Sequence, residues 1–93
     1  MTYRVVYNQR AYSEDKSKLP ILIQKRLEKA IRERLMTEPI KYSRPLQESL
    51  KGYRRLRIGD YRVLFQIKGM VVCIELISHR SKVYKEAVKR LFK

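Results

Sequence analysis

Residues 53–77 contain three strand-length apolar stretches separated by two tight turns, and this pattern constrains the fold more than any other feature of the chain. The stretches are Tyr53–Ile58, Tyr61–Ile67 and Val71–Ile77. Gly59 and Asp60 form a two-residue hairpin signal, and Lys68 and Gly69 turn the chain again. Strands joined by two-residue turns pair antiparallel. The second half of the chain therefore predicts an antiparallel meander.

The alternation of side chains gives this meander two faces of different character. Successive side chains point to opposite sides of a strand, so apolar and basic residues separate. The apolar face, which we expect to pack against helices, comprises Leu56, Ile58, Val63 and Phe65. The opposite, open face comprises Tyr53, Arg55, Arg57, Arg62 and Gln66. The basic side chains are thus predicted to stand on a rigid surface and not in a disordered tail.

Strand and helix signals occupy the rest of the chain. The run Tyr3–Tyr7 predicts a first strand. Asn8 is a good N-cap for a short helix at Gln9–Ser17, and a longer helix is predicted at Pro20–Met36. Thr37–Ser49, which contains two prolines, is predicted as a loop. A last helix has one apolar side, formed by Val83, Tyr84, Ala87, Val88 and Leu91.

The resulting order, β-α-α-β-β-β-α, predicts an α+β fold. We expect a small antiparallel sheet with helices, a helical hairpin among them, packed on one face. With 93 residues the chain is long enough for one modest core, so residues 1–93 are expected to form a single domain. The pattern leaves open where the first strand joins the sheet and in which direction.

The charge balance indicates a polyanionic partner. Lys and Arg number 23 against 9 Asp and Glu, a formal net charge of +14. The mutual repulsion of so many positive charges disfavours the folded state unless a partner neutralises them. The basic residues lie on short strands and turns and not along one amphipathic helix, which argues against a membrane surface. No span approaches transmembrane length, and the N-terminal apolar run is too short for a signal peptide, so a cytoplasmic protein is expected.

Arg55, Arg57 and Arg62 of the open face are the strongest functional signal. A tight hairpin brings same-face residues of two strands close together, and like charges side by side are destabilising. A bound phosphate backbone would explain why all three are present. The alternative is a solvated face whose long side chains splay into water.

Three further candidates follow the last strand of the meander. Arg80 lies at a strand–helix junction, a place where rigid elements hold functional side chains, and its alternative is an ordinary surface arginine. His79 is the one side chain here of a type whose unperturbed pKa lies near neutrality, yet a lone histidine is more often a structural hydrogen-bonder. Tyr84 belongs to the apolar side of the last helix, and it can pack its ring while exposing its hydroxyl.

The sequence contains no motif for a metal or a cofactor. One cysteine and one histidine cannot build a zinc site, and Asp60 and Glu75 do not form a metal cluster. We therefore expect neither cofactor nor metal, so any catalysis must use Arg, Tyr, His and Lys. Cleavage of RNA by its own 2′-hydroxyl is such a reaction. The substrate supplies the nucleophile, while the enzyme aligns it, moves protons and stabilises the transition state with cations.

Four segments together resemble the RelE toxins of the RelE/ParE superfamily. They are Leu50-Lys51-Gly52, the run RLRIGDYR from Arg55 to Arg62, His79-Arg80 and Val83-Tyr84. The resemblance implies a RelE-like fold and a toxin of a type II toxin–antitoxin pair that enters the ribosomal A site, cleaves mRNA there and inhibits translation. The implied partners are a cognate antitoxin, which wraps the toxin and blocks it, and the 70S ribosome with its mRNA and rRNA.

The resemblance also implies roles for single residues. Arg62 resembles the arginine that stabilises the scissile phosphate, and Arg80 resembles the one that serves the leaving group or the transition state. Tyr84 resembles the tyrosine that stacks on a base or assists proton transfer. Arg55 lies where well-studied members have a lysine, and arginine cannot act as a base near neutral pH. The base would then be His79, Tyr84 or Lys51, and the residues expected to bind RNA are Lys51, Arg54, Arg57 and Lys82.

Two other functions remain open. The first is inhibition of DNA gyrase by a ParE-like toxin on the same fold, and the second is a non-catalytic basic module that binds RNA or the ribosome. Arg62, Arg80 and Tyr84 favour the nuclease, because gyrase inhibition needs no phosphate-cleaving set. The replacement of lysine by arginine keeps the non-catalytic module open.

Overall fold

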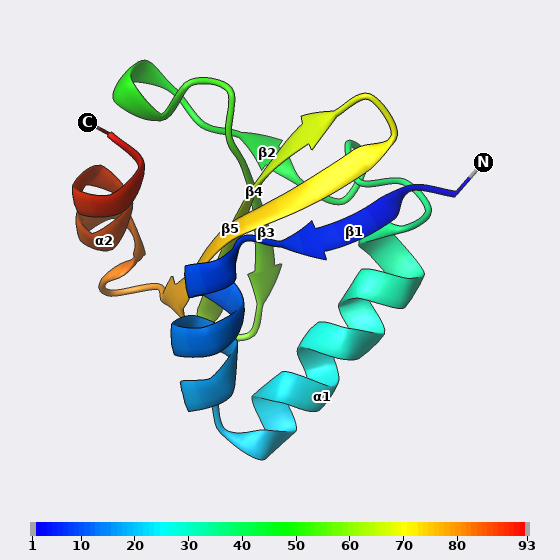
Figure 1. The fold of residues 1–93 in the computed structure, drawn as a ribbon, viewed down its shortest axis with the longest axis horizontal. Helices are drawn as coiled ribbons and strands as arrows, with labels where there is room; N and C mark the ends of the chain where they lie inside the picture. The colour runs from blue at the N-terminus through cyan, green and yellow to red at the C-terminus, as the bar shows by residue number, and fades with distance from the viewer. Residues whose placement is uncertain (1, 93) are drawn as a thin grey trace.

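The computed structural model describes residues 2–92 and confirms the predicted α+β fold (Figure 1). The strands are β1 (Arg4–Tyr7), β2 (Arg44–Pro45), β3 (Arg54–Ile58), β4 (Tyr61–Lys68) and β5 (Val71–His79). The regular helices are α1 (Ile21–Ala30) and α2 (Val83–Leu91). Tighter or wider helical turns occupy Ala11–Asp15, Lys16–Lys18, Ile31–Leu35 and Glu48–Leu50. Within the described residues, no helix is both long and apolar enough to cross a membrane.

The strands form one sheet in the order β1-β5-β4-β3-β2. β3, β4 and β5 pair antiparallel, as the turn signals predict, and the register places Arg57 directly opposite Arg62. β1 lies beside β5 in parallel, with Val5 next to Val72. This position, which the sequence pattern left open, makes the sheet mixed. A parallel pair needs a long connection, and the chain between β1 and β5 provides it.

The predicted loop at Thr37–Ser49 contains the short strand β2, which the sequence reading missed. β2 pairs with Arg54 and Arg55 at the outer edge of β3. Two residues are too few to show alternation, and Pro45 lacks the amide hydrogen of a central strand, so the segment gives no strand signal. Both properties are compatible with an edge.

The helical hairpin of residues 11–35 covers one face of the sheet, as predicted (Figure 1). Asn8 caps its start, with Oδ1 accepting a hydrogen bond from the Ala11 amide at 2.7 Å. Residues 31–35 continue α1 as a wider turn, closed by a bond from Met36 N to Ile31 O at 2.9 Å. The core of this layer includes Leu27, Leu35, Leu56, Ile58, Val63 and Phe65. The residues that β3 and β4 contribute to this core, Leu56, Ile58, Val63 and Phe65, are the apolar face predicted from alternation.

α2 lies against the other face of the sheet, which corrects the expectation that the helices share one face. A second, smaller core there comprises Leu50, Leu64, Leu76, Val83 and Ala87. The consecutive residues 63–65 are all buried, which is typical of a strand covered on both faces. That run is a sequence signal for the second layer. Of the basic residues predicted on an open face, Arg57 is exposed and Arg55 half-buried, but Arg62 is buried, because α2 also packs on this face.

Candidate active site

The residues predicted as catalytic meet around one surface depression of about 430 Å³. They are Arg55 on β3, Arg62 on β4, His79 at the end of β5, Arg80 in the following turn and Tyr84 in the first turn of α2. Ser81 completes the lining, and the sequence reading missed it because a serine in a polar turn has no distinguishing pattern. Side chains from three strands and α2 therefore converge at one place.

Arg62 is the buried member of this set, with 9% of its surface exposed. Its Nη1 donates hydrogen bonds to the carbonyls of Gly59 and Tyr61, each at 2.9 Å. Among residues 2–92, no carboxylate lies within 4.0 Å of its guanidinium. Burial, and then the guanidinium groups of Arg57 and Arg55, lower the pKa of Arg62. The predicted crowding of Arg55, Arg57 and Arg62 is confirmed, and none of the three pairs with a carboxylate of the described residues.

Arg55 and Tyr84 are joined across the depression. Arg55 Nη1 donates a hydrogen bond to Tyr84 Oη at 2.5 Å, which fixes the position of the hydroxyl. A tyrosine oxygen that accepts this bond keeps its own proton and can donate it to a ligand oxygen. The Tyr84 residue is also 40% exposed, enough for a base to stack on its ring. The geometry is compatible with both roles that the family resemblance implies.

His79 is oriented by Ser81. The Ser81 amide donates to His79 Nδ1 at 3.2 Å, and Ser81 Oγ lies 2.8 Å from the same nitrogen. Because a backbone amide can only donate, Nδ1 is an acceptor, and the proton of the neutral ring is on Nε2. The ring also packs edge-on against Tyr61, with 5.5 Å between centroids. Neutral His79 is therefore a hydrogen-bond donor at Nε2, and the lone pair that a general base would use is engaged.

The backbone of Arg80 is held by a hydrogen bond, whereas its side chain is only weakly held. Its amide donates to Asp60 O at 2.8 Å, which ties the end of β5 to the β3–β4 turn. Its Nε lies 3.8 Å from Asp60 Oδ1, and both side chains are largely exposed. An exposed pair of this kind contributes about 0–1 kcal/mol. The guanidinium can therefore turn toward a ligand at little cost.

The residues predicted to bind RNA are distributed differently. Arg57 is exposed on the same face as Arg62, while Lys51 and Lys82 are exposed in the turns before β3 and α2. Arg54 lies on the other side of β3, and its Nε donates to Ser43 Oγ at 2.7 Å. Its Nη2 bonds the carbonyls of Ile40 and Ser43. Arg54 therefore holds the loop before β2 and stands apart from the depression.

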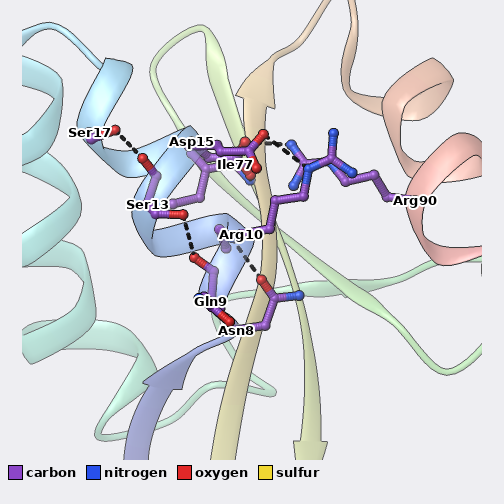
Figure 2. A network of polar contacts seen from close by, with 10 residues as sticks. Asn8, Gln9, Arg10, Ser13, Asp15, Ser17, Ile77 and Arg90 are labelled. Carbon is purple, nitrogen blue, oxygen red and sulfur yellow. Dashed lines mark hydrogen bonds and ion pairs between the residues drawn. The ribbon is translucent and has the colours of Figure 1, made fainter.

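A buried ion pair, drawn in Figure 2, anchors α2, the helix that also contains Tyr84. The side chains of Asp15 and Arg90 are 8% and 11% exposed and pair with each other. The second carboxylate oxygen of Asp15 accepts a hydrogen bond from the Ile77 amide of β5 at 3.0 Å. One carboxylate thus joins the helical hairpin, β5 and α2. The paired residues are 75 positions apart, so no local sequence pattern reveals them.

The chemistry of the depression is that of cations and proton donors. Its members are the guanidinium groups of Arg55, Arg62 and Arg80, the Tyr84 hydroxyl and His79 Nε2. Arginine binds phosphate with paired N–H groups. Within residues 2–92, no group of three His, Cys, Asp or Glu side chains is placed to hold a metal ion. The set can bind a phosphate group and donate protons to its oxygens.

Comparison with known proteins identifies similar chains. Residues 9–84 match the family described as the ParE toxin of the type II toxin–antitoxin system parDE. A chain of the RelBE2 toxin–antitoxin complex from Mycobacterium tuberculosis is 30% identical, with a TM-score of 0.80 and coverage of 86% of this chain and 100% of that one. A chain of the archaeal RelE–RelB complex from Pyrococcus horikoshii is 27% identical, with a TM-score of 0.67 and coverage of 88% and 99%.

The isolated RelE toxin of E. coli is 25% identical, with a TM-score of 0.68 and coverage of 96% and 98%. No curated protein sequence matches the chain. The family match runs from the start of the helical hairpin to Tyr84, so it includes every element that lines the depression. The chain therefore belongs to the ParE toxin family of the RelE/ParE superfamily and is a RelE-type toxin of a type II toxin–antitoxin system.

Proposed function

We propose that this toxin is a ribosome-dependent endoribonuclease that cleaves mRNA in the ribosomal A site and so inhibits translation. The observation that carries the proposal is Arg62, a buried arginine that has no carboxylate partner among residues 2–92 and lies beside a depression lined by other cations and proton donors. A scissile phosphate would supply the missing negative charge.

In the proposed reaction, the 2′-hydroxyl of the RNA attacks the adjacent phosphorus and displaces the 5′-oxygen of the next nucleotide. The products are a 2′,3′-cyclic phosphate and a free 5′-hydroxyl. Arg62 and Arg55 bind the non-bridging oxygens, where negative charge grows in the transition state. The Tyr84 hydroxyl donates a proton to the leaving oxygen, and Arg80 turns toward it. Neutral His79 donates a hydrogen bond from Nε2 to a phosphate oxygen.

The same geometry supports dependence on the ribosome. The arginines stay protonated near neutral pH, and Ser81 engages the free lone pair of neutral His79. The depression therefore offers no strong base, and the 2′-hydroxyl proton passes to solvent. Alignment of the attacking hydroxyl must then come from elsewhere, and positioning contributes about 7–11 kcal/mol in favourable cases. The ribosome would supply that alignment in the A site.

Primer extension on mRNA from a reconstituted translation system tests the proposal. We expect wild-type toxin to cut within A-site codons and Arg62→Ala to cut at least about 100-fold more slowly, the usual effect of losing one transition-state donor. Naked mRNA at the same toxin concentration should stay intact. Rapid cutting of naked mRNA would contradict ribosome dependence, and full activity of Arg62→Ala would contradict the assigned site.

We further propose a cognate antitoxin as the protein partner, because similar chains occur in RelBE2 and RelE–RelB complexes. An acidic antitoxin segment is expected to lie over the basic face or to displace α2. The net charge of +14 should make this association fast and sensitive to salt. An association rate that is equal at low and high salt would contradict electrostatic capture.

Action on ribosomes would place the toxin in the cytoplasm.

The family match favours one second candidate, ParE-like inhibition of DNA gyrase. A supercoiling assay with purified gyrase separates the two functions, because the nuclease proposal expects supercoiling to be unaffected by the toxin. Inhibited supercoiling without mRNA cleavage would establish the gyrase candidate. Arrested translation with neither effect would indicate a non-catalytic RNA- or ribosome-binding module.

A further inference from the structure

A second basic region, which the proposed cleavage does not use, adjoins the candidate active site. Two depressions of about 390 and 150 Å³ lie between α1 with its continuation and the outer edge of β3. Together they form what we call the α1–β3 groove. Its lining includes the basic and aromatic residues Arg26, Lys29, Arg34, Tyr42, Arg44 and Arg57. Arg34 and Arg57 line both depressions, and Arg55 lines both the groove and the active-site depression. One continuous surface thus leads from Arg62 to α1.

The cations of the groove lack counter-charges. Among residues 2–92, no carboxylate lies within 4.0 Å of Arg26, Lys29, Arg34, Arg44 or Arg57. Two cations outside the groove, Arg10 and Lys41, do pair with carboxylates at the exposed surface, those of Glu14 and Glu38. Glu33 is the acidic side chain among the lining residues. A row of unpaired like charges disfavours folding unless a polyanion lies beside it.

The guanidinium of Arg26 lies against the β3–β4 turn. Gly59 in that turn has φ +58°, and a side-chain carbon there would lie 3.0 Å from Arg26 Nη1. Glycine therefore serves the turn and also leaves room for the guanidinium. This close approach places the guanidinium of the exposed Arg26 beside the β3–β4 turn, in the same depression as Arg57.

Tyr42 adds an aromatic ring to the basic lining. It is 42% exposed, and the guanidinium carbon of Arg34 lies 5.9 Å from its ring centroid. Basic side chains that follow phosphates, combined with an exposed ring on which a base stacks, are typical of sites for single-stranded nucleic acid. A paired duplex hides its base faces and could not use the ring.

We propose that the α1–β3 groove binds the single-stranded RNA that continues beyond the scissile phosphate. The identity of this strand rests on the proposed nuclease function, and its path follows from Arg55, which is shared between the two sites. The groove cations bind successive phosphates of the strand, and Tyr42 stacks on one of its bases.

Binding of fluorescent 2′-O-methyl RNA, which cannot be cleaved, tests the groove without any cleavage step. The test compares an oligonucleotide of about three nucleotides, chosen to engage the active-site depression alone, with one of about nine, chosen to extend into the groove. Arg26→Ala/Lys29→Ala should weaken binding of the longer RNA about tenfold at low salt and that of the shorter one less than twofold. The slope of log affinity against log salt for the longer RNA should fall by roughly 1.

The matched control is Lys25→Ala/Arg32→Ala, which removes the same charge from exposed positions of the same helical segment outside the groove. It should bind both RNAs almost as the wild type does. Tyr42→Leu should weaken binding of the longer RNA with no change in salt slope. Equal losses in the groove and control variants would overturn the proposal. So would groove variants that bind both RNAs normally but lose affinity for ribosomes or for an acidic antitoxin.

The two proposals can fail separately. A wild-type toxin that cuts no mRNA, while the groove variant still loses affinity for the longer RNA, would overturn the nuclease and leave the groove. A wild-type toxin that cuts mRNA, while the groove and control variants bind alike, would overturn the groove and leave the nuclease.

Discussion

The surroundings of Arg62 and Arg90 differ in one respect, although both arginines are largely buried. The Arg90 side chain is 11% exposed and pairs with the buried carboxylate of Asp15. Arg62 is 9% exposed, and within residues 2–92 its hydrogen-bond acceptors are the carbonyls of Gly59 and Tyr61. Three further arginines, Arg57, Arg55 and Arg80, act on its charge. A counter-charge supplied by the chain indicates a structural arginine. A buried arginine to which the described residues supply no counter-charge is instead expected to bind an anionic ligand.

The largest effect on stability is expected at Arg90. Arg90→Met keeps much of the volume but leaves Asp15 buried and unpaired, which should lower the free energy of unfolding by about 3–5 kcal/mol. Urea denaturation followed by circular dichroism measures it. The matched control is Arg10→Met, because Arg10 also pairs with a carboxylate but at the exposed surface, where the loss should be below about 1 kcal/mol.

A double variant keeps this prediction testable if Arg90→Met does not fold. Asp15→Leu/Arg90→Met removes both charges, so it should recover part of the lost stability, short of the hydrogen bond that Asp15 accepts from the Ile77 amide. Equal unfolding curves for Arg90→Met and the wild type would show that the pair does not anchor α2.

Tyr84 should matter for activity more than for stability. Tyr84→Phe keeps the ring and deletes the hydroxyl that accepts from Arg55. Cleavage should slow about 100-fold if the hydroxyl donates a proton, while the free energy of unfolding changes by less than about 1.5 kcal/mol. Tyr12→Phe, at another exposed tyrosine, is the control. Unchanged cleavage rates in Tyr84→Phe would show that the hydroxyl has no catalytic role and that Tyr84 acts only by packing or stacking.

Arg62→Lys should make cleavage depend on pH. Burial and the guanidinium groups of Arg57 and Arg55 lower the pKa of Arg62, and they should lower that of a lysine there from its ordinary value of about 10.4. The charged form is lost as pH rises through a lowered pKa, so activity relative to wild type should fall toward alkaline pH. Arg80→Lys, at an exposed position, should follow the wild-type profile. Parallel profiles for Arg62→Lys and the wild type would contradict the unpaired environment.

Local patterns made the meander and its basic face predictable. The turn at Gly59 and the alternation of Leu56 with Arg55 and Arg57 depend only on neighbours in sequence, and the structure keeps them. The proximity of Arg80 and Tyr84 was also predictable from the order of elements, because the end of a strand lies close to the start of the helix that follows it.

Contacts between distant segments could not be predicted in this way. The parallel place of β1 and the position of α2 depend on which apolar surfaces meet, and the Asp15–Arg90 pair depends on that arrangement in turn. The orientation of His79 depends on Ser81, whose contact with the imidazole appears only once the turn has its three-dimensional form. Composition carries no information about such pairings.

Unfolding of Arg62→Ala, measured beside Arg90→Met in the same buffer and paired with primer extension, tests the central claim most directly. We predict that Arg62→Ala stays within about 1 kcal/mol of wild-type stability, because relief of like-charge repulsion offsets the lost hydrogen bonds, while mRNA cleavage is lost. Destabilisation as large as that of Arg90→Met, with cleavage retained by the folded fraction, would contradict the account. Arg62 would then be a structural arginine like Arg90.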